Sequence, residues 1–218
     1  MSIPVKQAAP GRPKDLEKRA SILEAGKRLF PRQGFDGTSM DAIAAEAGVS
    51  KLTVYSHFTD KETLFKEVIR AKCEEQIPSE LFEVDRQESI RGQLLTIARA
   101  FFSLITSEEA ISLHRMMTAQ TQQSVKLATL FWEAGPKRLQ DSFEAFLIAE
   151  VEAGQLQVAE PWRATSQFFC LLKGELHARM MCGCSEPYCD TAVSDHLNAT
   201  VDLFLRAYAP RPATISLV

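Results

Sequence analysis

The chain has 218 residues, of which 45% are hydrophobic and 24% are charged, with a formal net charge of −3. These values are typical of a globular protein with one large domain or two small ones. No stretch reaches the roughly 18 apolar residues of a transmembrane helix, and the first residues lack the apolar segment of a signal peptide, so we expect a soluble, cytoplasmic protein with no membrane partner.

The charge is unevenly distributed along the chain. Residues 1–72 contain 13 Lys and Arg against 9 Asp and Glu, whereas residues 73–218 contain 12 against 19. A basic front and an acidic remainder are what a phosphate-binding head followed by a second domain would show.

The hydrophobic pattern predicts an all-α protein of nine or ten helices, since no segment alternates as a β-strand does. Residues 1–14 hold three prolines, a glycine and three basic residues, and we expect a flexible basic arm there. The first helix is predicted from Leu16 to Gly34, because glycine tolerates the positive φ of a helix end. Thr38 and Asp41 form a capping box that would begin a second helix.

The next helices of the first domain, residues 15–75, follow closely. Gly48 is expected to end the second helix and Ser50 to cap the third. Thr59 and Glu62 form another capping box, which would begin a longer fourth helix.

A larger helical domain is predicted for residues 76–210, with a tail at 211–218. The polar, acidic stretch from Pro78 to Glu88 is expected to be a hinge. Helical periodicity then predicts helices over residues 89–106, 108–121, 124–133, 136–153, 161–181 and 190–207.

The stretch 39–58 has the spacing of a helix-turn-helix, the DNA-binding motif whose second helix enters the major groove. Small Ala44 and Ala47 would let two short helices approach closely, and Gly48 would supply the left-handed turn. Val54 and Phe58 would anchor the second helix. The outward face of that second helix would then present hydroxyl groups, which can meet base edges or phosphates, and apolar groups, which can meet thymine methyl groups.

The candidate DNA-binding residues lie on this motif, at the starts of its helices and in the arm. They are Thr38, Ser39, Ser50, Lys51, Leu52, Thr53, Tyr55, Ser56, His57 and Lys61, with Arg12 and Lys14 of the arm. Two plainer interpretations stay open: the hydroxyl residues could serve only as helix caps, and the basic arm could be an ordinary tail instead of a minor-groove hook.

The segment from Ile22 to Phe65 resembles the TetR/AcrR family of bacterial regulators. The resemblance is carried by Gly34-Phe35, Thr38-Ser39, Ile43-Ala44, Ala47-Gly48-Val49-Ser50, Val54-Tyr55-Ser56-His57-Phe58 and Lys61-Glu62-Thr63-Leu64-Phe65. It implies a three-helix DNA-binding head, a larger helical ligand-binding body, and a homodimer on a palindromic double-stranded DNA operator. It also implies phosphate contacts for Tyr55, His57 and Lys61. Leu52 departs from the family, in which a glycine is common at this place.

The body resembles AefR-like and AcrR-like members through Phe131-Trp132-Glu133-Ala134-Gly135-Pro136 and Leu171-Leu172-Lys173-Gly174-Glu175-Leu176-His177. Many of those members control efflux pumps or respond to small amphiphiles. The resemblance therefore implies a small hydrophobic or amphiphilic inducer and no cofactor. The pocket candidates are Phe101, Ile105, His114, Met117, Phe131, Phe169 and His177, although core packing is the alternative for most apolar members.

The last two helices are the predicted dimer interface. Their apolar candidates are Leu197, Val201, Leu203, Phe204 and Leu205. Just before the final helix, Cys182, Cys184 and Cys189 have C-x-C-x₄-C spacing, unlike the paired spacing of zinc sites. We therefore expect no metal and reduced thiols, with a thiol sensor as the alternative.

These patterns predict a sequence-specific, ligand-responsive repressor of the TetR type, with a multidrug-efflux or amphiphile-response operon as the specific hypothesis. We find no phosphate loop, zinc-protease helix or nucleophile elbow, so an enzyme is not expected. An enzyme and a protein-interaction module with a vestigial head stay as competing classes, and activation stays open beside repression.

Overall fold

The computed structural model describes residues 16–120, 125–184 and 188–210. The predicted arm, with Arg12 and Lys14, and the predicted tail lie outside the described residues. Within the described ranges all regular secondary structure is helical, with no β-strand, which confirms the predicted fold class. None of the described helices is long and apolar enough to cross a membrane.

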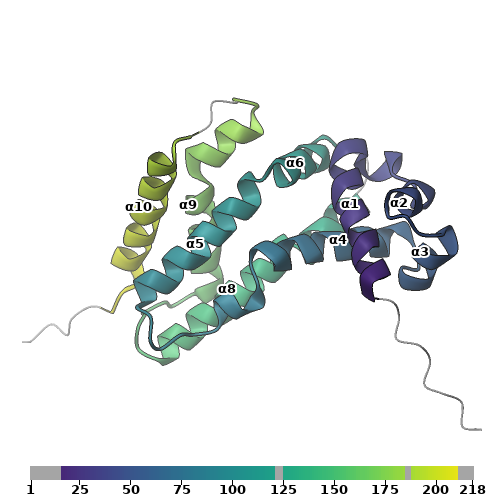
Figure 1. The fold of residues 1–218 in the computed structure, drawn as a ribbon. Coiled ribbons are helices and arrows are strands. Elements are labelled where there is room, and N and C mark those ends of the chain that lie inside the picture. The colour runs from purple at the N-terminus through teal and green to yellow at the C-terminus, as the bar shows by residue number, and fades with distance from the viewer. Residues whose placement is uncertain (1–15, 121–124, 185–187, 211–218) are drawn as a thin grey trace, which may run out of the picture.

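The described residues form ten α-helices and one 3-10 helix (Figure 1). They are α1 (Leu16–Gly37), α2 (Met40–Glu46), α3 (Lys51–His57), α4 (Lys61–Gln76), η1 (Ser79–Phe82), α5 (Ile90–Thr106), α6 (Glu108–Gln120), α7 (Val125–Ala134), α8 (Pro136–Glu152), α9 (Pro161–Met181) and α10 (Asp190–Tyr208).

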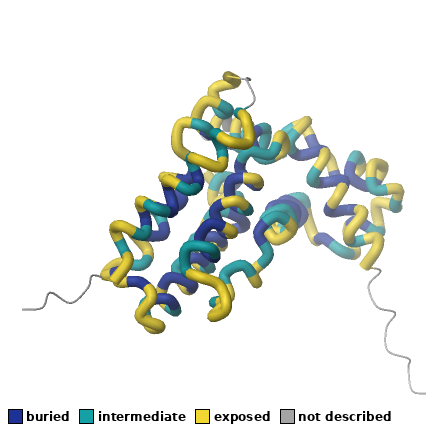
Figure 2. The backbone as a smooth tube through the Cα atoms, turned by 60° about the vertical axis from the view of Figure 1, so that its left-hand side comes forward, coloured by how far each residue is buried: buried dark blue, intermediate teal, exposed yellow. Residues whose placement is uncertain are grey.

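The helices form a small head, α1–α4, and a longer body, α5–α10, at opposite ends of the molecule (Figure 1). Helix α4 contacts α1 in the head and both α5 and α7 in the body. Buried positions lie along the inward faces of the helices and exposed ones along their outer faces (Figure 2). The amphipathic periodicity of the sequence therefore determines which face of each helix is buried.

Two hydrophobic cores hold the molecule together, and the head core is not built by the head alone. Phe30, Phe58 and Phe65 are fully buried at its centre. Met117 of α6 and Leu127 of α7 are buried in the same cluster. Two body helices therefore contribute to the head core. The predicted domain boundary between residues 75 and 76 separates residues that belong to this one core.

Both predicted capping boxes of the head are wrong by one residue. Ser39, not Thr38, caps α2, because its Oγ accepts the N–H of Ala42 at 3.0 Å. Asp60, not Thr59, caps α4, because its carboxylate accepts the N–H of Thr63 at 2.7 Å. The prediction for Ser50 is confirmed, since its Oγ accepts the N–H of Thr53 at 3.1 Å.

The segment between Pro78 and Glu88, predicted as a hinge, is packed against the body. The segment forms η1, and Leu81 and Phe82 pack against the body core. Arg86 of the same segment lies 3.2 Å from the buried carboxylate of Glu150 in α8. An ion pair to a buried carboxylate fixes the segment to the body, so the polar sequence here is a packed connection.

Helix α9 contains a break that periodicity did not predict. Gly174 has φ 47° and ψ −157°, outside the helical region and outside the range open to residues with a β-carbon. The ring Nε2 of His196 in α10 lies 2.9 Å from the carbonyl oxygen of Leu172, which the break releases. Helix α10 therefore supports α9 where its regular hydrogen bonding fails.

The packing of α10 shows that three residues predicted for the dimer interface are not available to it. Leu197, Val201 and Phe204 are buried in the protomer's own core against α5 and α9. Leu205 is half-buried against the same core, whereas Leu203 is exposed. One helix face packs inward, so only residues on the opposite face are available to a second chain.

Candidate functional site

The α2–turn–α3 unit has the geometry of a helix-turn-helix. Gly48 has φ 65°, and the N–H of Val49 donates to the carbonyl of Ala44 at 3.0 Å, which closes the turn between the helices. Val54 and Phe58 are buried and fix α3 on the head core. The predicted turn and anchors are confirmed, and α3 is left with one face outward.

That outward face is apolar at its centre. The side chain of Leu52 is 80% exposed, and that of Tyr55 is also exposed. Lys51 pairs with Asp41 of α2 at 2.8 Å, while the Oγ of Ser56 donates to the carbonyl of Thr53 at 2.7 Å. Leu52 and Tyr55 are thus the large side chains that this face presents, an arrangement suited to a groove with thymine methyl groups and phosphates.

The candidate DNA-binding residues at the starts of α2 and α4 differ in their surroundings. Thr38 is fully buried and its Oγ1 donates to the carbonyl of Gly34 at 2.7 Å, so its side chain holds the end of α1 and only its backbone could approach a phosphate. Ser39 is its surface neighbour, which caps α2. Lys61 donates to the carbonyl of Phe35 at 2.7 Å and its ammonium lies 4.4 Å from the Phe35 ring centroid, so it also ties α4 to α1.

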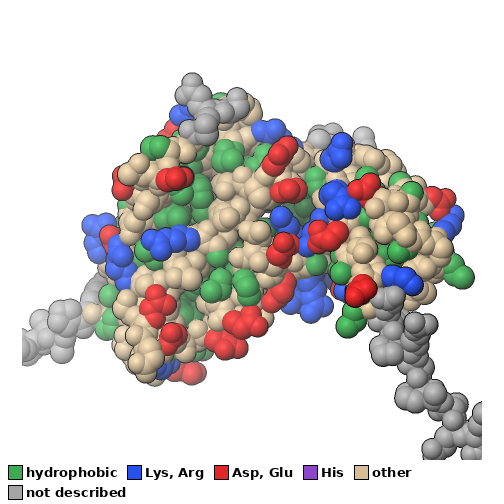
Figure 3. Space-filling model, viewed as in Figure 1, with side chains coloured by type: hydrophobic (Ala, Val, Ile, Leu, Met, Phe, Trp, Pro, Cys, Tyr) green, Lys and Arg blue, Asp and Glu red, His purple; other side chains and the backbone are tan. Residues whose placement is uncertain are grey.

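The face of the head visible in Figure 3 carries Lys and Arg side chains interspersed with Asp and Glu. Basic groups of the head are also paired with carboxylates: Arg28 with Glu46 at 2.8 Å and Arg19 with Glu67 at 2.7 Å. The positive balance of the first 72 residues therefore does not form a continuous basic surface on this face.

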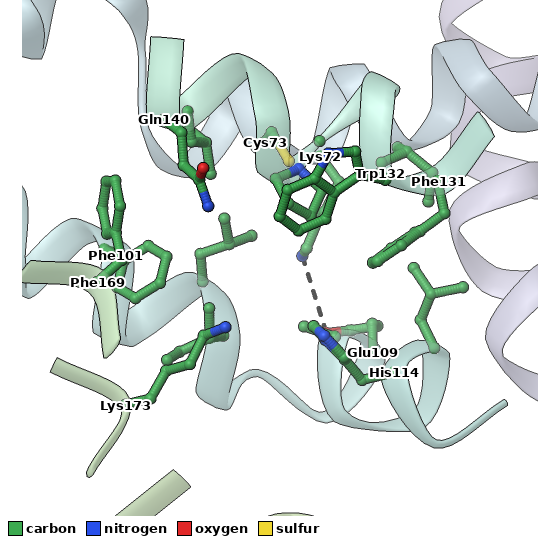
Figure 4. A pocket seen from close by; sticks show the side chains of 18 of the residues that line it. Lys72, Cys73, Phe101, Glu109, His114, Phe131, Trp132, Gln140, Phe169 and Lys173 are labelled. Atoms are coloured by element: carbon green, nitrogen blue, oxygen red, sulfur yellow. Dashed lines mark ion pairs between the residues drawn. The ribbon is translucent and has the colours of Figure 1, made fainter. Parts of the chain in front are cut away.

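A cavity of about 320 Å³ lies where the head meets the body. Its wall includes Phe30 of α1, Ile69 and Lys72 of α4, and a larger set from α5 to α9. That set includes Phe101, Leu104, Ile105, Glu109, Leu113, His114, Phe131, Trp132, Leu139, Gln140, Ser166, Phe169, Cys170 and Lys173. Figure 4 shows the aromatic residues Phe101 and Phe169 at one end and Phe131 and Trp132 at the other.

Five of the predicted pocket residues line this cavity, namely Phe101, Ile105, His114, Phe131 and Phe169. Two predictions are corrected. Met117 is buried in the head core, because the end of α6 packs on α1. His177 stands behind the wall, with its ring centroid 6.0 Å from that of His114.

The polar residues of the cavity were not predicted from the sequence. They include Lys72, Glu109, Gln140 and Lys173, each of which lies on a helix with other exposed charges, and no spacing distinguishes them. Phe30 and Ile69 were not predicted either, because their helical periodicity is that of ordinary head core.

Burial controls the protonation of the two histidines. Burial lowers the pKa of His114, and the nearby charge of Lys173 lowers it further. Burial, together with His114 and Lys173, lowers the pKa of His177 to about 4. Both rings are therefore neutral at pH 7, and the Nε2 of His177 is buried with no hydrogen-bond partner among the described residues.

Acidification is expected to destabilise the protein through His177. Between its ordinary pKa near 6.5 and the folded value, the unfolded chain binds a proton that the folded chain does not, so stability falls as the pH falls. We expect a loss of about 1–2 kcal/mol between pH 7 and pH 5. Urea unfolding of the wild type and of His177→Gln at both pH values checks this, and parallel losses in the two proteins would contradict it.

The cysteines do not form a metal centre in the described residues. No group of three or more His, Cys, Asp or Glu side chains able to hold a metal occurs there. Cys182, Cys184 and Cys189 are free and exposed, and Cys73, at the cavity wall, has its pKa raised to about 11 by burial. Hydrogen bonding by the backbone N–H of Ala192 lowers the pKa of Cys189.

The fold and the exposed α3 define the class as a helix-turn-helix DNA-binding protein with an appended helical body. Residues 92–210 match the family model described as the C-terminal domain of AefR-like transcriptional repressors, and residues 22–68 match that of the tetR family of bacterial regulatory proteins. The chain belongs to the TetR family of transcriptional regulators.

Its relatives agree with this assignment. A TetR-family regulator from Mesorhizobium loti has a solved structure with 30% identity and a TM-score of 0.75, covering 91% of this chain and 100% of that one. The flavonoid-responsive regulator FrrA has 32% identity and a TM-score of 0.70, covering 89% and 98%.

The transcriptional regulator AcrR of Shigella flexneri is 39% identical over 83 residues, 38% of this chain and 37% of that one. Membership in this family identifies the chain as a DNA-binding transcriptional regulator and not an enzyme.

Proposed function

We propose that the protein is a ligand-responsive repressor that binds a palindromic operator as a homodimer. The observation that carries this proposal is the composition of the cavity wall, to which α1 and α4 of the head contribute beside α5–α9 of the body. A ligand bound there touches the DNA-binding head directly. Its differential affinity for two head positions would then shift operator binding.

One of the ion pairs between head and body lies at the cavity wall. Nζ of Lys72 in α4 lies 3.8 Å from the carboxylate of Glu109 in α6 (Figure 4). A ligand that separates α4 from α6 would move the head relative to the body. In a dimer this changes the spacing of the two α3 helices, which must be about 34–36 Å to reach successive major grooves.

The residues proposed to contact DNA are those of α3 and its flanks, without the side chain of Thr38. Leu52, Thr53 and Tyr55 would meet the major groove, with Ser50, Lys51 and Ser56 beside them. Ser39, His57 and Lys61 would meet phosphates, and Arg12 and Lys14 would reach the minor groove.

The ligand would be small and hydrophobic or amphiphilic, since most of the cavity wall is apolar. FrrA is named as flavonoid-responsive, which supports a response to a small organic molecule here. Such ligands suit control of a multidrug-efflux or amphiphile-response operon.

In vitro selection of an operator, followed by a reporter assay, tests the proposed function. The purified protein should prefer the selected palindrome to random duplexes throughout a salt series, because base contacts persist where phosphate contacts weaken. A reporter behind that operator should be expressed more strongly when the regulator is absent. Equal affinity for selected and random duplexes, or lower expression without the regulator, would contradict the proposal.

The outer face of α9 and α10 is the proposed dimer interface. Leu171 of α9 and Leu203 of α10 are exposed there, beside a groove that Ala207 and Tyr208 also line. Leu203→Glu is expected to raise the dimer dissociation constant by about tenfold or more, because a carboxylate would be buried without a partner.

Sedimentation equilibrium measures this effect on dimerisation. Ile148→Glu on α8 is the matched control, since Ile148 is 42% exposed and Leu203 is 47% exposed. Equal dissociation constants for wild type and Leu203→Glu would exclude this face as the interface.

A further inference from the structure

The charged groups of the cavity wall are unequal in number and in pairing. Three lysines, Lys27, Lys72 and Lys173, line the cavity with one carboxylate, that of Glu109. Lys27 donates to Glu24 at 2.8 Å and to Glu75 at 2.6 Å, and Lys72 pairs with Glu109. Lys173 has no ion pair or hydrogen bond with its ammonium among the described residues, so its charge is the one left to a ligand.

Lys173 lies at the end of the regular first part of α9. It is the residue before Gly174, so it ends the regular helical segment that carries Ser166 and Phe169. Figure 4 shows its side chain reaching from α9 into the space between Phe169 and His114, with Gln140 entering from α8 on the other side. The side chain is half-buried, which reduces the solvation of its ammonium.

The neighbouring groups cannot neutralise Lys173. His114 and His177 are held neutral, and part of the reason is the positive charge of Lys173 itself. The amide of Gln140 and the hydroxyl of Ser166 are further polar groups of the wall, and each can donate a hydrogen bond. Most of the remaining wall is apolar, with aromatic rings at both ends.

We propose that the cavity selects an amphipathic organic anion, with an apolar, aromatic-compatible body among the phenylalanines and a single acidic group paired with Lys173. This inference rests on the proposed function, because it names the chemical class of the ligand for the same cavity. An anion would gain a charge-assisted hydrogen bond in a site of reduced solvation. A neutral molecule of the same shape would leave the ammonium unpaired, and a cation would be repelled.

Two fluorescent probes with the same rings test the proposal. One is 8-anilinonaphthalene-1-sulfonate, an aromatic monoanion, and the other is N-phenyl-1-naphthylamine, which lacks the sulfonate. Their dissociation constants are measured by fluorescence titration with the full chain. The wild type should bind the sulfonate more tightly, and Lys173→Met should weaken sulfonate binding by about tenfold or more while leaving the neutral amine within about twofold.

Matched variants separate charge from packing. Lys173→Arg keeps the charge and should keep the sulfonate affinity to within a few fold of the wild type. Lys137→Met removes a lysine of α8 that pairs with Asp141 on the surface and should alter neither probe. Ile105→Trp fills the cavity and should weaken both probes. Circular dichroism and thermal unfolding establish that each variant is folded.

The outcomes distinguish the inference from the function on which it rests. If both probes bind and Lys173→Met leaves the sulfonate affinity unchanged, the anion proposal is overturned and the ligand cavity stands. If neither probe binds the wild type, or folded Ile105→Trp binds both as the wild type does, the proposed ligand response is overturned as well. Operator binding by the same preparations reports on the DNA-binding head independently.

Discussion

Leu52→Asp is expected to lower operator affinity by about 100-fold, the equivalent of roughly 3 kcal/mol. Leu52 has the most exposed large apolar side chain of α3, the helix proposed to enter the major groove. A carboxylate at this place would approach base edges and phosphates with no partner of its own. Both the desolvation of the carboxylate and its repulsion by the phosphates oppose binding.

The fold should tolerate this change. Leu52 is 80% exposed and lies in the first turn of α3, where a negative charge is favourable to the helix dipole. We expect the free energy of unfolding to change by less than about 0.5 kcal/mol. Affinity measured by fluorescence anisotropy with the selected operator, beside urea unfolding, therefore separates a DNA contact from a folding defect.

Val125→Asp is the matched control for Leu52→Asp. Val125 is 79% exposed and begins α7, so the same carboxylate is added at an equally exposed apolar position outside the helix-turn-helix. It should leave operator affinity within about twofold of the wild type. If both variants bound the operator as the wild type does, α3 would not be the recognition helix.

Gly174→Ala is expected to destabilise the protein by about 2–4 kcal/mol. The backbone of Gly174 lies at positive φ, which a residue with a β-carbon occupies only with strain. An added β-carbon would also lie 2.7 Å from the Cε1 of His196, closer than real contacts allow. Either α9 straightens or α10 moves, and both changes disturb the body core.

Gly154→Ala isolates the backbone contribution to this loss. Gly154 also has positive φ, at 71°, but an added β-carbon there meets nothing within 4 Å. It should cost about 1 kcal/mol. The double variant Gly174→Ala, His196→Ala removes the clash and should be less destabilised than the sum of the two single changes. Urea unfolding measures the wild type, the three single variants Gly174→Ala, Gly154→Ala and His196→Ala, and the double variant. Equal losses for the two glycines would refute the contact with His196.

Local signals in the sequence were sufficient for most of the helices. Some residues begin or end a helix within one turn of their own position, and the structure confirms these helix ends. They are Gly48, Ser50, Pro136 and Pro161. The errors at Thr38 and Thr59 are of one residue, because adjacent polar residues compete for the same cap and only the packed backbone selects between them.

Signals that depend on distant residues were weaker. Periodicity predicted that Leu197, Val201 and Phe204 share an apolar face, but it does not reveal whether that face meets its own chain or a second one. The cavity was likewise only partly predictable, because helices far apart in the sequence form its wall. Its aromatic residues were predictable as apolar body positions, whereas nothing in the sequence distinguishes Lys173 from a surface lysine, although it shares a face of α9 with Ser166 and Phe169.

The core shared by head and body limits which fragments of this regulator can fold alone. Met117 and Leu127 fill a space beneath α1 and α4, so a fragment ending near residue 75 would open that interior to water. Exchange of DNA-binding specificity between relatives would therefore succeed more readily by regrafting α3 alone than by transplanting the entire N-terminal segment. Heating should melt the chain in one cooperative transition, since α6 and α7 of the body complete the core of the head.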